Sequence, residues 1–165
     1  AAPPSESTSC AAGAIWDPLY ATHERVPLWS DVAYRTLAEL AATAPDAGVR
    51  MLDPEEDELL AASEVHSFAP SDLGDPQALG DAVAATGASA VYIHVDLDVL
   101  DPADIAGVSS PEPFGITPAA LVAAIGAVRA RVPLAGGSIA GFSPQTPAAA
   151  VEDMGTILRI VGALA

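Results

Sequence analysis

Short apolar runs and amphipathic stretches alternate along most of this chain. Each amphipathic stretch follows an Asp-Pro or Thr-Pro pair, which supplies an N-cap acceptor and then a proline suited to the first helical turn. The pattern predicts these helices: 54–63, 76–87, 118–131 and 147–164. The apolar runs between them are typical of strands. The predicted strands are 48–52, 63–68, 89–98 and 136–143.

Alternation of strands and helices with short loops indicates an α/β domain, with three layers (α/β/α) built on a mostly parallel sheet. The run at 89–98, SAVYIHVDLD, is apolar over several residues and is interpreted as a central strand buried on both faces. Functional side chains in such sheets gather at the carboxyl ends of the strands. We therefore expect Asp53, Asp96, Asp98 and Ser143 along one rim.

The amino-acid composition argues against several classes of protein function. The 165 residues include 22 acidic and 6 basic side chains, all of the latter arginine, for a net charge of −16. This balance argues against nucleic acid and against an anionic membrane surface as partners. Cys10 is the only cysteine, so no disulfide framework or cysteine zinc cluster is expected. Without an apolar run of membrane-spanning length or a signal-peptide pattern, the sequence predicts a cytoplasmic protein.

The motif Asp96-Leu97-Asp98 carries the candidate chemistry. Residues two apart in an extended chain project to the same side, so both carboxylates can reach one point. Hard oxygen donors of this kind suit Mg²⁺, Mn²⁺ or Ca²⁺. The alternative, that either aspartate only caps the strand or the following turn, stays open. Asp101, which precedes Pro102, is interpreted as a turn or cap residue.

The segment around this motif, VYIHVDLDVLDPADIAGVSSPEPFGIT, resembles the signature of the ureohydrolase family (arginase, agmatinase and formimidoylglutamase). In that signature a strand ends in D-x-D-x-x-D-P and a loop of the type P-G-x-x-x-P-E-x-G-G follows. The similarity extends to GVRMLDPEE at 48–56 and to SIAGFSP at 138–144. It divides the chain into a C-terminal part of an arginase-like α/β domain (47–165) and a poorly matched segment containing one helix (1–46).

The resemblance implies a hydrolase that cleaves a C–N bond of a small guanidino or amidine substrate at a pair of Mn²⁺ ions. Asp96, bridging the ions, and Asp98 would be metal ligands. Asp53 and Glu56 would lie near the polar tail of the substrate, and Ser110 would line the pocket floor beside the metals. The family commonly assembles as trimers or hexamers, which leaves a homo-oligomer open as a partner.

The sequence departs from the family pattern in two ways. Gly141 stands where the family has the glutamate that receives the guanidinium. The G-G-D-H-S and D-A-H-x-D segments, which carry further metal ligands, have no counterpart in 1–46. His23 is a weak candidate for the pocket histidine, while His66 and His94 are interpreted as hydrogen-bonded structural residues. Two carboxylates cannot hold two mutually repelling divalent ions, so a weak, partial manganese site is predicted.

Two alternatives follow from these departures. The chain could be a catalytically inactive family remnant that acts as a binding or assembly module. It could also be a haloacid-dehalogenase-like phosphatase, because YIHVDLDVL fits the first motif of those enzymes. The absence of lysine argues against the phosphatase, which needs one for its phosphoaspartyl intermediate. An arginase-like sheet incomplete at its N-terminal side would expose an edge, so self-association is also expected.

Overall fold

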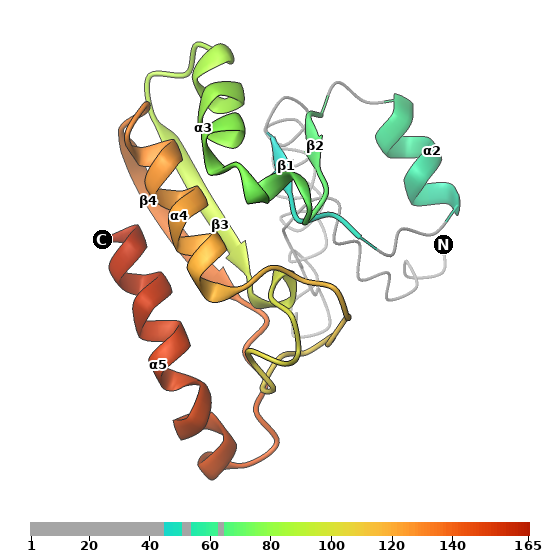
Figure 1. Cartoon of the computed structure of the whole chain (residues 1–165), viewed down its shortest axis with the longest axis vertical. Helices are drawn as coiled ribbons and strands as arrows, with labels where there is room; N and C mark the ends of the chain where they lie inside the picture. Colours follow the sequence, from blue (N-terminus) through green and yellow to red (C-terminus); the bar gives the residue numbers. More distant parts are fainter. Residues whose placement is uncertain (1–44, 51–53, 63–64) are drawn as a thin grey trace, which may run out of the picture.

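Two pairs of parallel strands organise the part of the chain that the computed structural model describes, residues 45–50, 54–62 and 65–165. The strand β1 (Asp46–Ala47) pairs with β2 (Ser67–Phe68), and β3 (Val91–Asp96) pairs with β4 (Leu134–Ala140). The helices are α2 (Pro54–Ala62), α3 (Pro76–Ala85), α4 (Pro118–Arg129) and α5 (Pro147–Leu164) (Figure 1). The predicted α/β class is confirmed. His23 and the helix expected within 1–46 lie outside the described residues.

Helix starts follow the capping pairs read from the sequence. The Asp75 carboxylate accepts the N–H of Gln77 at 3.0 Å at the start of α3. The hydroxyls of Thr117 and Thr146 each accept an N–H three residues on, both at 3.2 Å, at the starts of α4 and α5. Such caps stabilise a helix by about 1 kcal/mol each. The predicted beginnings of these three helices are therefore confirmed.

The strands are shorter than predicted, and β1 is displaced. It ends at Ala47, before Gly48, whose φ is +90°. A Cβ at position 48 would overlap the Val99 side chain, so the missing side chain lets the end of β1 lie against the turn that follows β3. Such a backbone conformation is open to glycine at little steric cost. The prediction of a strand over 48–52 is therefore wrong for residues 48–50, the part of that range that the structure describes.

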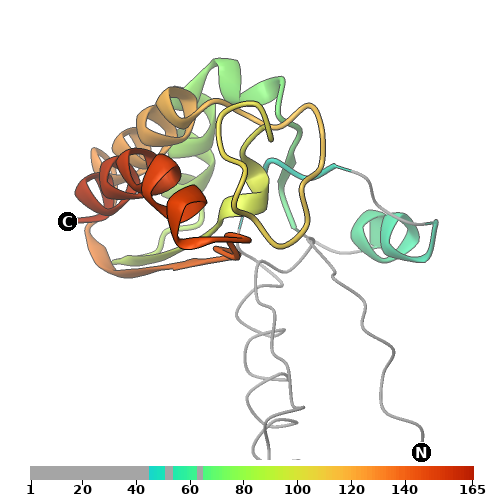
Figure 2. The same cartoon turned by 90° about the horizontal axis from the view of Figure 1, so that it is seen from below.

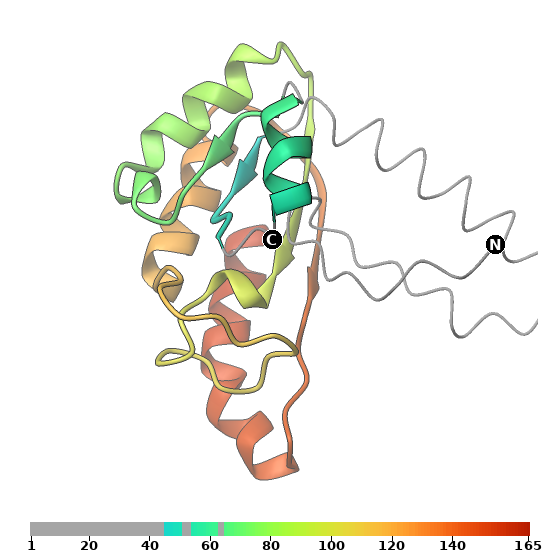
Figure 3. The same cartoon turned by 90° about the vertical axis from the view of Figure 1, so that its right-hand side faces the viewer.

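One face of the β3–β4 pair packs against helices. Val95 is buried in the core, and Val91 and Ile93 pack against it. Helices α3, α4 and α5 all cover this face (Figures 2 and 3). The core that they enclose includes these buried residues: Leu97, Leu100, Ile105, Leu121, Ile125, Val128 and Ile160.

The opposite face of β3 is open among the described residues. Tyr92 is 64% exposed and His94 is exposed as well. The expectation that this strand is buried on both faces is therefore wrong. The reason is visible in the sequence, since the inward residues of VYIHVD are all aliphatic and alternate with Tyr, His and Asp. That period of two is typical of a strand with one buried face.

A cavity of about 330 Å³ lies between the two strand pairs, lined by β1, β3 and apolar side chains of α3 and α4. It also reaches Asp96 and Asp98, so the predicted acidic motif borders this cavity. No helix among the described residues has the length and apolar character to cross a membrane.

Asp46 makes the stability of this region depend on pH. One carboxylate oxygen is buried without a hydrogen-bond partner, and burial raises the pKa of Asp46 from 3.8 to about 7. The folded chain then binds more protons than the unfolded chain between those values. The free energy of unfolding should therefore fall as the pH rises from 4 to 7 and level off above that.

We expect Asp46→Asn to remove this pH dependence and to stabilise the fold at pH 8 by on the order of 2 kcal/mol. Urea unfolding from pH 4 to 8 measures both effects. Asp104→Asn, at an exposed loop position, is the matched control and should leave the pH profile unchanged. If the free energy of unfolding depended on pH in the same way in Asp46→Asn, the assignment of this dependence to Asp46 would be contradicted.

Candidate metal and substrate site

Asp96 and Asp98 meet at the carboxyl end of β3, but a turn brings them together and not the extended strand. Asp96 is the last residue of β3, and Asp98 lies in the 3₁₀ turn Leu97–Val99. The Asp98 N–H donates to the Asp96 carboxylate at 3.1 Å. The geometry predicted from residues two apart in a strand is therefore wrong. Asp96 caps the turn, and the capping role left open for it in the sequence is observed.

Asp98 is the buried member of the pair, at 5% exposure. Its carboxylate accepts the N–H of Ser110 at 3.3 Å. The nearby Ser109 side chain also lowers the pKa of Asp98, but less than burial raises it. Burial, followed by the nearby charge of Asp96, raises the pKa of Asp98 above its ordinary value. A buried carboxylate beside a second one is stabilised in its charged form by a cation. The pair therefore has the electrostatic character of a cation site.

Arg50 connects the segment after β1 to this turn and to the following loop through hydrogen bonds. Its guanidinium donates to the carbonyl oxygens of Asp98, of Glu112 at 3.0 Å and of Pro113 at 3.3 Å. The positive charge of Arg50 also opposes the rise in the pKa of Asp98. Sequence reasoning did not single out Arg50, although it lies within the segment GVRMLDPEE that carries the resemblance. The signal that could have found it is its rarity, because it is one of only six cationic side chains in a chain with 22 acidic ones.

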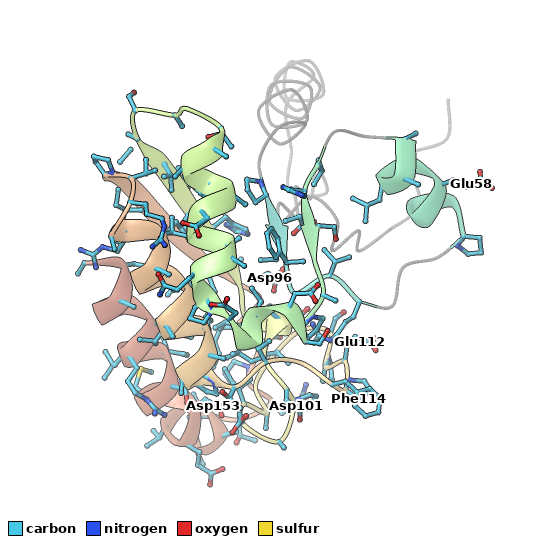
Figure 4. All side chains as sticks on the ribbon, turned by 45° about the horizontal axis from the view of Figure 1, so that its top comes forward. Glu58, Asp96, Asp101, Glu112, Phe114 and Asp153 are labelled. Atoms are coloured by element: carbon cyan, nitrogen blue, oxygen red, sulfur yellow. The ribbon has the colours of Figure 1, made fainter. Side chains whose placement is uncertain are left out.

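Asp153 anchors the other end of the loop that connects β3 to α4. It is 7% exposed and accepts the N–H groups of Ala106 at 3.3 Å and Gly107 at 2.8 Å. The Gly107 carbonyl in turn accepts the N–H of Ser143 at 2.8 Å. Figure 4 labels Asp153 on α5 and Asp96 at the end of β3. Asp153 was also missed, though a charge on the buried stripe of an apolar helix could have revealed it.

Asp101 has the turn-capping role predicted for it. One carboxylate oxygen accepts the N–H of Ala103 and the other accepts that of Phe114, both at 2.9 Å. The second bond spans the loop and holds Phe114, whose φ is +65°, beside the start of the loop. Figure 4 shows Asp101, Glu112 and Phe114 in this loop region.

The two described histidines make their ring contacts with residues other than Asp96 and Asp98. His94 Nδ1 is 2.6 Å from the Ser138 hydroxyl on β4, and burial lowers the pKa of His94 despite the opposing charge of Asp96. The His66 ring packs against Phe68 with 5.7 Å between centroids. The hydrogen bond expected for His94 is observed, but its ring is exposed, so the expectation that it is buried is wrong. His66 is also exposed, and the contact described for its ring is the one with Phe68.

The structure does not describe the side chains of the two acidic substrate-binding candidates, Asp53 and Glu56. Asp53 lies outside the described residues. Glu56 belongs to α2, which stands apart from α3, α4 and α5 in Figures 1 and 2, and its side chain is outside the description. Gly141 has φ +82°, and a Cβ there would overlap the Asp96 carboxylate. Position 141, where the resemblance implies a glutamate in the family, therefore admits no side chain in this arrangement.

The described residues do not fit a binuclear manganese centre. Within 45–50, 54–62 and 65–165, no three His, Cys, Asp or Glu side chains gather as metal ligands. Asp96 and Asp98 supply two carboxylates, and one oxygen of each already accepts a backbone N–H. Divalent ions that carry out hydrolysis in pairs need more ligands than these two residues offer.

The structure is that of a parallel α/β protein with two aspartates directly after a strand. Comparison with known families shows the family to which the chain belongs. The profile of the arginase family matches residues 33–158, most of the chain. The chain therefore belongs to the arginase family. The match begins ahead of the boundary expected at residue 47.

Individual relatives are distant and longer. The N(1)-aminopropylagmatine ureohydrolase of Synechocystis sp. is 28% identical over 83 residues, which cover 50% of this chain and 27% of that protein. Three solved structures share the fold. The arginase of Entamoeba histolytica has a TM-score of 0.64 at 18% identity, covering 73% of this chain and 42% of that one. The Helicobacter pylori arginase has a TM-score of 0.61 at 14% identity, covering 82% of this chain and 52% of that one. Proclavaminate amidino hydrolase from Streptomyces clavuligerus has a TM-score of 0.57 at 21% identity, covering 79% of this chain and 43% of that one. This chain thus spans about half of these structures or less.

The contact between Gly141 and Asp96 gives a testable consequence. We expect Gly141→Ala to destabilise the fold by about 1–3 kcal/mol, because it combines a positive φ with overlap against the Asp96 carboxylate. Urea unfolding measures the loss. The control is Gly126→Ala in α4, where a Cβ meets nothing within 4 Å and alanine should stabilise the helix by up to about 1 kcal/mol. Equal effects at both positions would contradict the packing described for Gly141.

Proposed function

We propose that this chain is part of a ureohydrolase that cleaves a C–N bond in a small guanidino or amidine compound. The proposal rests on the Asp96–Asp98 pair, which follows β3 within the region matched by the arginase family. The names of its relatives, a ureohydrolase, arginases and an amidino hydrolase, support this class of substrate. The substrate of the whole protein within that class is left open.

In this proposal Asp96 and Asp98 are the metal-binding residues that the chain contributes. Ser110 holds Asp98 through its backbone N–H. It keeps the role implied by the resemblance, on the pocket floor beside the metals. Asp53 and Glu56 keep the role implied by the resemblance, near the polar tail of the substrate. Arg50 is a positioning residue, because it acts on the carbonyl groups around the acidic pair. Residues 47–165 form the carboxyl-terminal part of the arginase-like domain.

Manganese is the proposed ion because the resemblance to the family implies it, and the hard carboxylate oxygens of the two aspartates are compatible with it. Two carboxylates support one weakly held ion, in keeping with the partial site expected from the sequence. The second ion of a complete family member would need ligands beyond the described residues. We therefore assign no reaction step to these residues.

A second candidate, an inactive family member that acts as a binding or assembly module, is favoured by Gly141. The Asp96 carboxylate occupies the space where a side chain at position 141 would have to begin, so the described geometry offers no carboxylate at that position to receive a guanidinium group. The phosphatase hypothesis loses its support, because membership of the arginase family accounts for the same D-x-D motif.

A Mn²⁺ titration by calorimetry tests the metal assignment. We expect no more than one weakly bound ion per chain, and we expect Asp96→Asn/Asp98→Asn to abolish that binding because both anionic ligands are removed. Asp104→Asn, an exposed aspartate in the following loop, is the matched control and should bind as the unaltered chain does. Binding that survives the double substitution would refute the assignment.

Urea release from agmatine and from arginine, measured with Mn²⁺ present, separates the two candidate functions. Turnover that is lost in Asp96→Asn/Asp98→Asn supports the hydrolase. Metal binding without turnover of either compound favours the inactive module. Two tightly bound ions per chain would show that residues outside the described set complete the centre.

A further inference from the structure

The cavity between the two strand pairs has the size and the lining of a small-molecule site. Its volume is about 330 Å³, and an apolar cavity of about 150 Å³ already holds a benzene molecule. Ligand sites in proteins are mostly apolar and contain a few polar groups that orient the ligand. This cavity has both features, because Asp46 lies among aliphatic residues of β3, α3 and α4. The aliphatic lining includes Leu79, Val83, Val91, Ile93, Leu121 and Ile125.

Asp46 is a polar group of this lining that lacks a partner. Among the described residues, one of its carboxylate oxygens is buried and accepts no hydrogen bond. Buried polar atoms in proteins are nearly always hydrogen-bonded. The backbone that carries the carboxylate is fixed, since the Asp46 N–H donates to the His66 carbonyl at 3.0 Å and β1 pairs with β2. A donor on a bound molecule would satisfy this oxygen.

The charge of Asp46 also lacks compensation. Within the described part of the chain, Asp46 has no ion-pair partner, and burial is the main cause of its raised pKa. Arg50 lines the same cavity, but its guanidinium donates to the carbonyl oxygens of Asp98, Glu112 and Pro113. A buried carboxylate without a neighbouring cation is stabilised in its charged form when a cation binds beside it.

The chemistry of the lining defines the ligand as an organic cation. A hard metal ion needs several oxygen ligands, and no three ligating side chains gather in the described ranges. A wholly apolar molecule would leave the Asp46 oxygen without a donor. Asp96 and Asp98 border the cavity as well, but one oxygen of each already accepts a backbone N–H. An ammonium group with a hydrocarbon part satisfies both Asp46 and the aliphatic lining.

We propose that this cavity binds a small organic ammonium ion, whose nitrogen donates to the Asp46 carboxylate and whose hydrocarbon part lies among the aliphatic side chains of β3, α3 and α4. The inference does not rest on the proposed ureohydrolase activity, because it uses neither a metal ion nor the acidic pair. It also gives a reason for a buried carboxylate that lowers the stability of the unliganded chain, since binding residues are commonly kept at a cost in stability.

Calorimetric titration of the full chain with benzylammonium at pH 8, in metal-free buffer, tests the site. We expect one bound molecule per chain. Benzyl alcohol has a similar shape without the charge and should bind at least about tenfold more weakly, because a charge-assisted hydrogen bond is lost. Asp46→Asn should weaken benzylammonium binding by at least about tenfold as well. That variant is expected to be more stable at this pH, so unfolding does not explain the loss. Asp104→Asn is the matched control and should bind as the unaltered chain does.

The acidic pair supplies the test of location. Asp96→Asn/Asp98→Asn should retain the affinity for benzylammonium, because the proposed contact is with Asp46. Loss of binding in this double variant together with full binding in Asp46→Asn would assign the cation to the acidic pair and overturn the proposal. Equal binding of benzyl alcohol and benzylammonium, or no binding of benzylammonium at millimolar concentration, would also overturn it.

The pH dependence of binding gives an independent readout. Burial raises the pKa of Asp46 to about 7, so protons compete with the ligand below that pH. The affinity for benzylammonium should be constant above pH 7 and fall by about tenfold for each pH unit below it. His94→Gln should leave the midpoint of this profile unchanged, and a midpoint that moves with that substitution would overturn the assignment to Asp46. The other titratable or charged groups near the cavity are Arg50, His66, His94, Asp96 and Asp98.

Discussion

The burial of Asp98 is the constraint on which the described structure most depends. A carboxylate in that position needs hydrogen-bond donors and compensating charge, and the chain provides them from several distant segments. The Ser110 N–H comes from the loop after β3, and Arg50 reaches the Asp98 carbonyl from the segment after β1. The turn at the end of β3 therefore joins the two strand pairs, which share no strand-to-strand hydrogen bonds in the described sheets.

In the loop between β3 and α4, backbone N–H groups are likewise provided with hydrogen-bond partners. Its N–H groups at Ala106 and Gly107 are satisfied by Asp153, and that at Phe114 by Asp101. Carboxylates thus serve here mainly as acceptors for main-chain donors. Many of the acidic residues of this chain face solvent, but those near β3 shape the rim on which the metal assignment rests.

Much of the fold was readable from the sequence because its signals are local. The Asp-Pro and Thr-Pro caps depend on neighbouring residues only, so the starts of α3, α4 and α5 were predicted correctly. The open face of β3 was missed because its run of apolar letters concealed an alternation with Tyr92 and His94. Within the site, the D-x-D motif was found, whereas Arg50 and Asp153 were not. Their roles arise from contacts across 48 and 46 residues of chain, so the local signals that mark these two residues do not reveal what they contact.

Gly141 couples two distant positions of the sequence. Because a Cβ at position 141 would overlap the Asp96 carboxylate, the residue types allowed at positions 96 and 141 depend on each other. A larger residue could occupy position 141 only together with a shift of Asp96 or of the strand end that carries it. The effects of substitutions at these two positions on stability are therefore non-additive.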